Sequence, residues 1–204
     1  MDKVVVKYID IDSIEKNFDM VISLVDNDRL IKAKRYRQKS DQLLSLGAGY
    51  LMKKYLGDGK KKTNQNGKIY LQNGPFFNIS HSGKYVVLAI SENREVGVDI
   101  QLIDEKDLKT IEHVSNEHKT LDEMFQIWTN KESLIKCLGK NISLIKSIPG
   151  LPITGKRTFK HDLFYTQSLL FDGYALSITL EGEEPFEIIL EGSQPFEIIF
   201  ERTN

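Results

Sequence analysis

Two charged side chains interrupt the apolar face of a predicted helix. Read at about 100° per residue, residues 121–138 place four apolar side chains on one stripe: Leu121, Phe125, Trp128 and Ile135. Glu132 falls within this stripe, and Lys136 lies one turn further on, at its edge. A carboxylate removed from water without a partner is strongly destabilising. The two residues therefore form either an ordinary ion pair, which usually lies on a solvated face, or part of a metal or phosphate site.

Two further polar groups suit the same chemistry. Ser80 and His81 form a small polar turn after a predicted strand. Asp99 and Gln101 share one face of the predicted strand 95–101, whose other face is apolar. Taken singly, His81 is explained as a hydrogen-bonded turn residue and Asp99 as an acid near a strand end. Taken together with the helix, they supply oxygen ligands for a hard cation and positive groups for phosphate.

The composition sets bounds on the class of protein. The 204 residues suit one large domain or two small lobes that share a core. Lys and Arg number 28 and Asp and Glu 29, and a net charge of -1 argues against nucleic acid or an anionic membrane as a partner. The single cysteine, Cys137, excludes an internal disulfide, and no pair of Cys and His residues has zinc-ligand spacing. Without a signal-peptide core or an apolar run of membrane length, we expect a cytoplasmic protein.

The predicted elements alternate along the chain. Strands are expected at residues 3–11, 67–71, 75–79, 85–90, 95–101, 163–165, 167–171 and 174–180. Helices are expected at residues 13–25, 40–56 and 121–138, and in parts of 104–120. This alternation favours an α/β architecture. Gly47, Ala48 and Gly49 lie in the middle of a predicted helix, where the missing side-chain bulk allows another element to approach closely.

Two segments have an ordinary explanation when they are considered alone. Residues 29–39 carry six cationic side chains, a pattern typical of a solvated face and only a weak indication of an anion site. Residues 181–190 and 191–200 are tandem copies of a ten-residue segment. Two copies are too few for a solenoid, so we expect a duplicated edge strand with proline near its start.

Three segments together resemble a known family. They are residues 77–83 (Phe-Asn-Ile-Ser-His-Ser-Gly), 96–100 (Val-Gly-Val-Asp-Ile) and 128–136 (Trp-Thr-Asn-Lys-Glu-Ser-Leu-Ile-Lys). In sequence and spacing they resemble the 4′-phosphopantetheinyl transferases of the surfactin-synthetase-activating type, and a looser match extends from about Arg29 to Leu176. The resemblance implies a fold of two similar α/β (α+β) lobes related by a pseudo-twofold axis, with the active site at the seam. The lobes would be residues 1–102 and residues 103–204, the second with the duplicated tail.

The resemblance also implies a reaction. Enzymes of this family move the 4′-phosphopantetheine arm of coenzyme A to a serine of an apo acyl or peptidyl carrier protein, and release adenosine 3′,5′-bisphosphate. The implied cofactor is Mg²⁺, and the implied partners are coenzyme A and the carrier protein, with the enzyme acting as a monomer. Positioning and charge stabilisation provide most of the catalysis in such transfers.

The family pattern further implies roles for individual residues. Asp99 and Glu132 would bind Mg²⁺, and Lys136 would neutralise the diphosphate of coenzyme A. Other contacts with coenzyme A are implied for Arg29, Lys32, Lys68, Ser80 and His81. The base that takes the serine proton would be Glu132 or Glu117, and the sequence leaves this choice open.

Two positions depart from the family pattern. Gln101 stands where many members have a second acid; it would bring an amide oxygen to Mg²⁺ without a charge, so we expect weaker metal binding. Leu44 stands where an arginine often assists phosphate binding, a contact left unfilled unless Lys34, Arg35 or Lys39 replaces it. These departures keep open an alternative function, a catalytically weak module that binds coenzyme A or a carrier protein.

Overall fold

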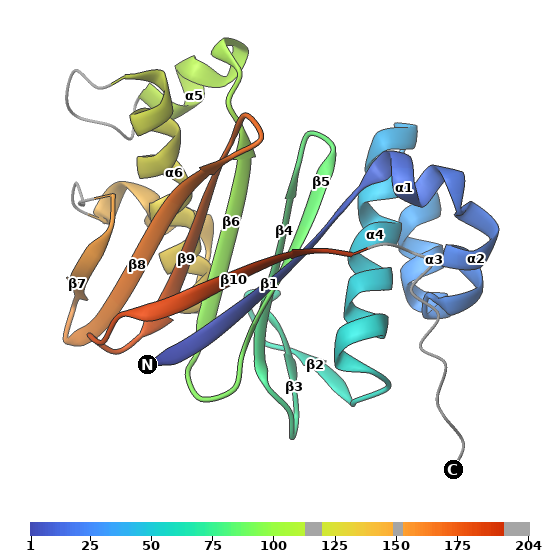
Figure 1. The fold of residues 1–204 in the computed structure, drawn as a ribbon, viewed down its shortest axis with the longest axis horizontal. Coiled ribbons are helices and arrows are strands. Elements are labelled where there is room, and N and C mark those ends of the chain that lie inside the picture. Colours follow the sequence, from blue (N-terminus) through green and yellow to red (C-terminus); the bar gives the residue numbers. More distant parts are fainter. Residues whose placement is uncertain (113–119, 149–152, 194–204) are drawn as a thin grey trace.

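Two four-stranded sheets form the centre of the molecule (Figure 1). The structure is a computed structural model that describes residues 1–112, 120–148 and 153–193. In spatial order the first sheet consists of β10 (Phe186–Gly192), β1 (Asp2–Asp10), β5 (Tyr85–Ser91) and β4 (Phe76–Ser82). The second consists of β6 (Val96–Leu102), β9 (Tyr174–Glu181), β8 (Asp162–Phe171) and β7 (Gly155–Phe159). A separate hairpin joins β2 (Lys61–Thr63) to β3 (Ile69–Leu71).

Helices pack on both sheets. On the first sheet, α4 (Lys39–Leu56) contacts β1, β4 and β5, and three shorter helices pack against α4: α1 (Ile11–Lys16), α2 (Phe18–Leu24) and α3 (Asn27–Lys34). On the second sheet, α6 (Leu121–Cys137) contacts β6, β8 and β9. Short helical segments precede and follow it: η1 (Glu105–Asp107), α5 (Leu108–Glu112) and η2 (Ile142–Ser147).

Strand β5 is buried on both faces, which explains its continuous apolar sequence. Val86 and Leu88 belong to the core formed with α4, whereas Val87 and Ala89 belong to the core between the two sheets. Alternate residues of a strand point to opposite faces. The layers therefore follow in the order α4, first sheet, second sheet and α6.

The mixed α+β class is confirmed, and most of the predicted elements are present. The predicted helix at 13–25 is instead two short helices, because Asn17 ends α1 and its side-chain amide donates to the carbonyl of Ser13 at 2.8 Å. The predicted strands at 163–165 and 167–171 form one strand, β8. Helix α3 overlaps the start of the basic run, β2 lies in the lysine-rich segment after α4, and β7 follows the proline-containing segment; none of the three is predicted from the sequence.

The glycines of α4 allow the close approach predicted for them. A Cβ atom added at Gly49 would lie 2.8 Å from Val25 Cγ1 and 2.6 Å from Arg29 Cγ. Because Arg29 belongs to α3, this glycine lets α3 lie directly against α4. The aliphatic part of Arg29 thereby packs against α4.

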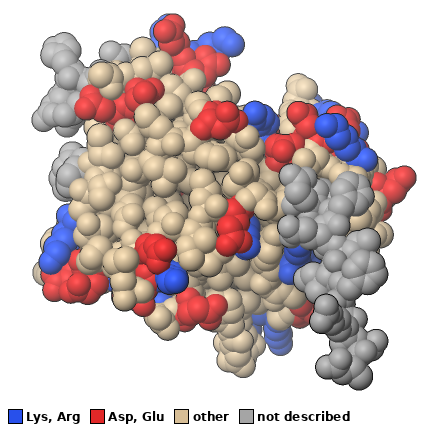
Figure 2. Space-filling model, in the orientation of Figure 1, with Lys and Arg blue, Asp and Glu red and all other residues tan. Residues whose placement is uncertain are grey.

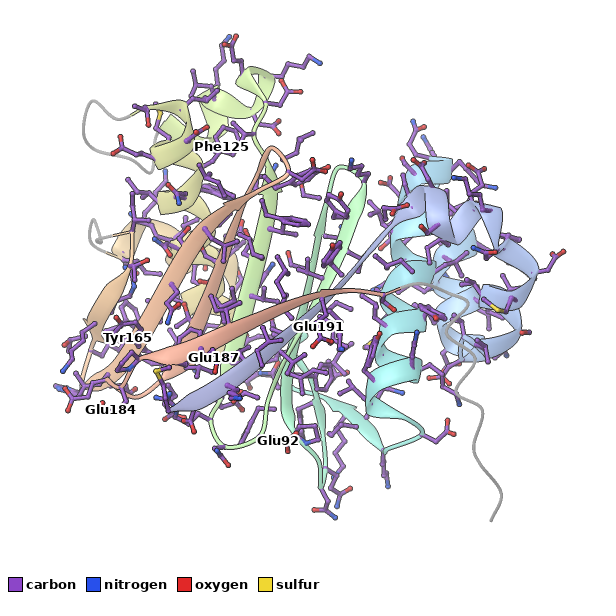
Figure 3. All side chains as sticks on the ribbon, in the orientation of Figure 1. Glu92, Phe125, Tyr165, Glu184, Glu187 and Glu191 are labelled. Atoms are coloured by element: carbon purple, nitrogen blue, oxygen red, sulfur yellow. The ribbon has the colours of Figure 1, made fainter. Side chains whose placement is uncertain are left out.

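The tail repeat contributes an outer strand to the first sheet. Its first copy forms most of β10, which pairs in parallel with β1 at the sheet edge, where an edge strand is predicted. Glu187 and Glu191 project from β10 (Figure 3) and form ion pairs with Lys3 and Lys7. Residues 194–200 of the second copy lie outside the described residues. The division into residues 1–102 and 103–204 thus does not coincide with the two sheets, since β6 lies in the second sheet and β10 in the first.

The visible surface carries no large field of one charge. On the face shown in Figure 2, acidic and basic side chains lie in small separate groups with uncharged surface between them, in keeping with the net charge of -1. None of the described helices is long and apolar enough to span a membrane.

Candidate active site

A pocket of about 420 Å³ lies where α3, β4, β6 and α6 meet. It also takes in the turn between β2 and β3 and the residues that follow α6. All but one of the site residues predicted from the sequence line it: Arg29, Lys32, Lys68, Ser80, His81, Asp99, Gln101, Glu132 and Lys136. The remaining one, Glu117, lies outside the described residues. Groups far apart in the sequence therefore share one pocket.

Side chains of β4 join the two sheets beside this pocket. Asn78, Ser80 and Ser82 alternate along β4, so their side chains share one face of the strand. Their oxygens accept hydrogen bonds of 3.1, 3.4 and 3.0 Å from alternate backbone N–H groups of β6: Val98, Ile100 and Leu102. The alternating small polar residues of segment 77–83 thus form the seam between the sheets, and they hold β4 next to Asp99.

Helix α6 lies directly on β6 because Gly97 has no side chain. A Cβ atom at Gly97 would lie 2.0 Å from the carbonyl oxygen of Ser133 and 2.4 Å from the backbone nitrogen of Cys137. Observed Cβ contacts essentially never fall below 3.0 Å, so glycine alone fits here. Asp99 follows Gly97 on the same face of β6. The close approach therefore brings the Asp99 carboxylate next to Lys136 of α6.

Hydroxyl groups hold α6 to the second sheet. Thr129 Oγ1 lies 2.7 Å from Ser177 Oγ of β9, and Ser133 Oγ lies 2.8 Å from Thr179 Oγ1. All four residues are fully buried, so each pair satisfies polar groups that would otherwise destabilise the fold by about 1–3 kcal/mol each. The apolar stripe predicted for this helix is therefore only part of its buried surface. Phe125, labelled in Figure 3, is fully buried as predicted and packs against Ala175 of β9, so the contact between α6 and β9 has both an apolar and a polar part.

Lys136 lies closer to the acid on the strand than to the acid on its own helix. Its Nζ is 2.5 Å from Asp99 Oδ1 and 3.8 Å from Glu132 Oε2. Nζ also donates to Ser80 Oγ at 2.9 Å, and Ser80 donates to the same Asp99 oxygen at 2.8 Å. An isolated i,i+4 pair between Glu132 and Lys136 therefore does not describe this site. The helix pair is the longer contact in a network that includes both sheets.

Burial raises the pKa of Glu132 to about 7, the negative charge of Asp99 adds to this rise, and Lys136 partly offsets it. Gln101, on the same pocket wall, donates its Nε2 to Asp107 at 3.3 Å, which leaves its amide oxygen for a ligand. Two carboxylates and an amide oxygen form a donor set that suits a hard cation. Among the described residues, no three His, Cys, Asp or Glu side chains are grouped as a metal site by themselves.

Three cations line the pocket without an ion-pair partner in the described part of the chain: Arg29, Lys32 and Lys140. Burial lowers the pKa of Arg29, and burial together with the charge of Arg29 lowers the pKa of Lys32. Positive side chains that crowd one another in this way favour the binding of an anion.

The rest of the basic run does not contribute to the pocket wall. Lys34, Arg35 and Lys39 are exposed and do not line it, so none of them takes the place of the arginine expected at position 44. Leu44 is itself buried in the core around α4. This departure from the family pattern is therefore a packing residue.

His81 lies on the pocket wall with an exposed imidazole. The surrounding walls partly remove it from water, and this burial, together with the charge of Lys136, lowers the pKa of His81. Both effects favour the neutral form of the ring. A neutral imidazole has one N–H donor, which is the group that would contact a phosphate oxygen.

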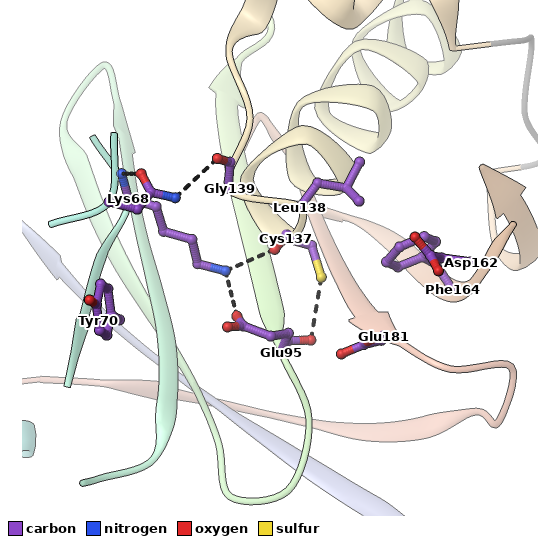
Figure 4. Close-up of a pocket in the computed structure, with 10 residues that line it drawn as sticks. Lys68, Tyr70, Glu95, Cys137, Leu138, Gly139, Asp162, Phe164 and Glu181 are labelled. Carbon is purple, nitrogen blue, oxygen red and sulfur yellow. Dashed lines mark hydrogen bonds and ion pairs between the residues drawn. The ribbon is translucent and has the colours of Figure 1, made fainter. Parts of the chain in front are cut away.

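Lys68 fastens the β2–β3 turn to the end of α6 (Figure 4). Its Nζ donates to Glu95 Oε2 at 2.5 Å and to the carbonyl of Cys137 at 2.9 Å. Two asparagines of the same turn donate to the carbonyl of Gly139 at 3.1 and 2.8 Å. These bonds satisfy carbonyl groups that the end of a helix leaves unpaired. Lys68 lines the pocket, but its ammonium group is directed to Glu95 and the helix end.

Besides Asn78 of β4, two polar residues of the pocket wall are not predicted from the sequence as site residues, Asn66 and Lys140. Asn66 precedes Gly67 in a turn between two short strands, a pair that signals a hairpin. Lys140 follows Gly139, which has a φ of 59° and ends α6. Both residues flank a glycine that turns the chain toward the pocket, and this was the signal available in the sequence.

Comparison with known proteins gives several relatives with one activity in their names. The chain is 30% identical over 185 residues to 4′-phosphopantetheinyl transferase gsp of Aneurinibacillus migulanus, with 78% of each chain covered. It is 24% identical over 158 residues to 4′-phosphopantetheinyl transferase Sfp of Bacillus subtilis strain 168, covering 67% of this chain and 70% of that protein. It is 35% identical over 82 residues to the L-aminoadipate-semialdehyde dehydrogenase-phosphopantetheinyl transferase of Xenopus laevis, covering 31% of this chain and 27% of that protein. No family model matches the chain.

Proposed function

The chain belongs to the 4′-phosphopantetheinyl transferases, and we propose that the pocket between α3, β4, β6 and α6 is its active site. The enzyme transfers the 4′-phosphopantetheine group to a carrier protein. We propose that coenzyme A is the donor and that the acceptor is a serine of an apo acyl or peptidyl carrier protein. One observation carries this assignment: cations that have no ion-pair partner among the described residues line the same pocket as the buried Asp99 and the half-buried Glu132.

The acids of the pocket suit Mg²⁺. Asp99 and Glu132 would hold it with their carboxylates, and Gln101 with its amide oxygen, because hard cations prefer oxygen ligands. When bound, the ion neutralises phosphate charge and polarises the phosphorus–oxygen bond that breaks. Because this ligand set has only two charged members, we expect it to bind Mg²⁺ more weakly than a set with a third acid at position 101.

The cations of the pocket bind and orient the phosphates of coenzyme A. We propose that Arg29, Lys32 and Lys140 hold the nucleotide phosphates, and that Lys136 contacts the diphosphate. His81 donates its single N–H to a phosphate oxygen. Ser80 and Lys68 act at the nucleotide end by fixing the pocket wall, since their polar groups are engaged with protein atoms. The number of positive donors compensates for the apolar residue at position 44.

The transfer is an in-line displacement at the phosphorus that carries the pantetheine arm. A bond forms between the serine oxygen of the carrier protein and this phosphorus, and the bond from phosphorus to the bridging diphosphate oxygen breaks. The bridging oxygen leaves with adenosine 3′,5′-bisphosphate, whose charge the pocket cations stabilise. The serine proton passes to a carboxylate, either Glu132 or Glu117.

The family resemblance also suggests how the chain is divided into lobes. We propose that residues 1–102 and 103–204 form two similar lobes related by a pseudo-twofold axis, with the active site at their seam. Two similar lobes are supported by the order of layers, because each sheet carries a long helix, α4 or α6, on the side away from the other sheet. Strands β6 and β10 are the exceptions, since each lies in the sheet that the other lobe mainly forms. The enzyme would act as a monomer in the cytoplasm.

The test is mass spectrometry of an apo carrier protein incubated with this protein, coenzyme A and Mg²⁺. We expect a mass gain of one phosphopantetheine group on the carrier serine. The alternative function, a module that binds coenzyme A or carrier protein without turnover, predicts binding with no mass gain. An absence of mass gain across fatty-acid, polyketide and peptide-synthetase carriers would reject catalysis.

Paired substitutions test the proposed roles of the pocket acids. We expect Glu132→Gln to reduce transfer nearly to zero, because it removes a charged ligand and a potential base, whereas Gln101→Ala has a mild effect. Glu117→Gln measured beside Glu132→Gln separates the base from the metal ligand. Small and equal losses in Glu132→Gln and Gln101→Ala would contradict the ligand assignment.

A further inference from the structure

The ammonium group of Lys136 lies among three oxygen atoms from three elements. Its Nζ is 2.5 Å from Asp99 Oδ1, 2.9 Å from Ser80 Oγ and 3.8 Å from Glu132 Oε2. The Asp99 side chain is only 5% exposed, whereas the Lys136 side chain is 29% exposed. The more buried acid of the pocket is thus neutralised by a long side chain that keeps contact with solvent.

Two neighbouring carboxylates, one buried and one half-buried, need a positive charge nearby. Desolvation and mutual repulsion both disfavour their ionised forms. Within the described residues, Lys136 is the one cation in ion-pair range of both Asp99 and Glu132. A hard divalent cation would use the same two carboxylates. An ammonium ion and a divalent cation held by one pair of acids repel each other, so the two compete.

We propose that Lys136 is the internal counter-ion of the metal-free site, and that a divalent cation binds Asp99 and Glu132 as the ammonium group leaves Asp99. This inference rests on the proposed function, because it takes these two acids to be metal ligands. The diphosphate of coenzyme A offers the displaced ammonium group a new partner in the same pocket. Metal and coenzyme A therefore strengthen each other's binding through Lys136, in addition to any direct contact between them.

Titration with Mn²⁺, followed by the electron paramagnetic resonance signal of the free ion, measures this competition without reference to activity. The proteins compared are the wild type, Lys136→Met and Lys140→Met, each with and without coenzyme A. Lys140 is a matched control, because it lines the same pocket and has no ion-pair partner in the described part of the chain. Lys136→Gln is measured as well, since its amide can donate to Asp99 without a charge.

Without coenzyme A, we expect Lys136→Met and Lys136→Gln to bind Mn²⁺ about tenfold more tightly than the wild type, because the competing charge is gone. Lys140→Met should change the affinity by less than about threefold, since it lies outside the acid network. Coenzyme A should raise Mn²⁺ affinity by a smaller factor in the Lys136 variants than in the wild type. Unchanged affinity in the Lys136 variants, or an equal gain in Lys140→Met, would overturn the counter-ion role.

Asp99→Asn separates failure of this inference from failure of its premise. If Asp99→Asn weakens Mn²⁺ binding while the Lys136 variants leave it unchanged, the metal site stands and the counter-ion role is rejected. If Asp99→Asn binds Mn²⁺ as tightly as the wild type, Asp99 is no metal ligand, and the premise and the inference fall together. Transfer of phosphopantetheine to a carrier protein by the wild type is measured separately, and it tests the proposed function whatever the Mn²⁺ titrations show.

Discussion

Replacing Gly97 with alanine would force α6 away from β6. The added Cβ would lie 2.0 Å from the carbonyl oxygen of Ser133, and because ordinary contact begins at 3.4 Å, the helix must move by about 1.4 Å. The second close atom is the backbone nitrogen of Cys137, so no side-chain rotation can relieve the clash. Overpacking of a core typically destabilises by about 1–3 kcal/mol. We expect Gly97→Ala to reach or exceed the upper figure.

The same movement would separate the charges of the site. Asp99 lies on β6 and Lys136 on α6, with 2.5 Å between Oδ1 and Nζ. A misplacement of about 1 Å at a catalytic centre can reduce the rate about 100-fold. We therefore expect the kcat for transfer to fall by about 100-fold or more in the fraction of Gly97→Ala that remains folded.

Urea unfolding and steady-state transfer to a carrier protein measure the two effects of Gly97→Ala. Gly47→Ala in α4 is the control, because its added Cβ would lie 3.1 Å from Val86 Cγ2, a side-chain atom that can shift. We expect Gly47→Ala to change stability by less than about 1 kcal/mol and to leave kcat unchanged. If Gly97→Ala behaves like this control in both assays, the contact between β6 and α6 does not position the site.

Three further predictions concern pH, the thiol and the tail. Because the pKa of folded Glu132 is raised to about 7 from the ordinary 4.5, its ionisation removes stability as pH rises between these values, on the order of 3 kcal/mol in metal-free buffer. In urea unfolding, Glu132→Gln should therefore be more stable than the wild type at pH 8, and the gain in stability should be far smaller at pH 5. Equal gains at the two pH values would contradict the raised pKa of Glu132. Burial raises the pKa of the Cys137 thiol to about 12, so a disulfide reagent at pH 8 should label it only in urea, and rapid labelling of the native protein would show an open site. Deleting 191–204 removes the last two residues of β10 and the hydrogen bonds of Ser193, so it should lower the free energy of unfolding by about 1–2 kcal/mol and leave kcat unchanged. Deleting 194–204 leaves these bonds in place and serves as the control. Equal stability of the two truncated proteins would contradict this role of β10.

The two faces of β6 could be predicted because a strand has a period of two. Val96, Val98 and Ile100 fill the core between the sheets, and Asp99 faces α6. The turn predicted at Ser80 and His81 is instead part of strand β4. Placing these two residues in one pocket with Arg29 and Lys32 depended on the family resemblance. Helical and strand periods assign residues to faces, but they do not say which faces of distant elements meet.

Other features depend on partners that local patterns cannot identify. Thr129 and Ser133 have side chains typical of a solvated helix face. They are buried because their hydroxyls form hydrogen bonds with those of Ser177 and Thr179. The parallel pairing of β10 with β1 joins the two ends of the described chain. Two nearly identical tail copies offer the same pattern, so the sequence alone cannot assign either copy to that edge.

The ion-pair partner of Lys136 could not be predicted correctly from the helix alone. An i,i+4 spacing makes Glu132 the expected partner, yet the shorter contact, 2.5 Å against 3.8 Å, is with Asp99. Asp99 is within reach because Gly97 lets the backbone of α6 rest on β6, and because Ser80 shares the same carboxylate oxygen across the seam. The ionic centre therefore belongs to the junction of the two sheets. A substitution that moves α6 away from β6 also separates Glu132 from Asp99, so it should weaken metal binding although both acids are present.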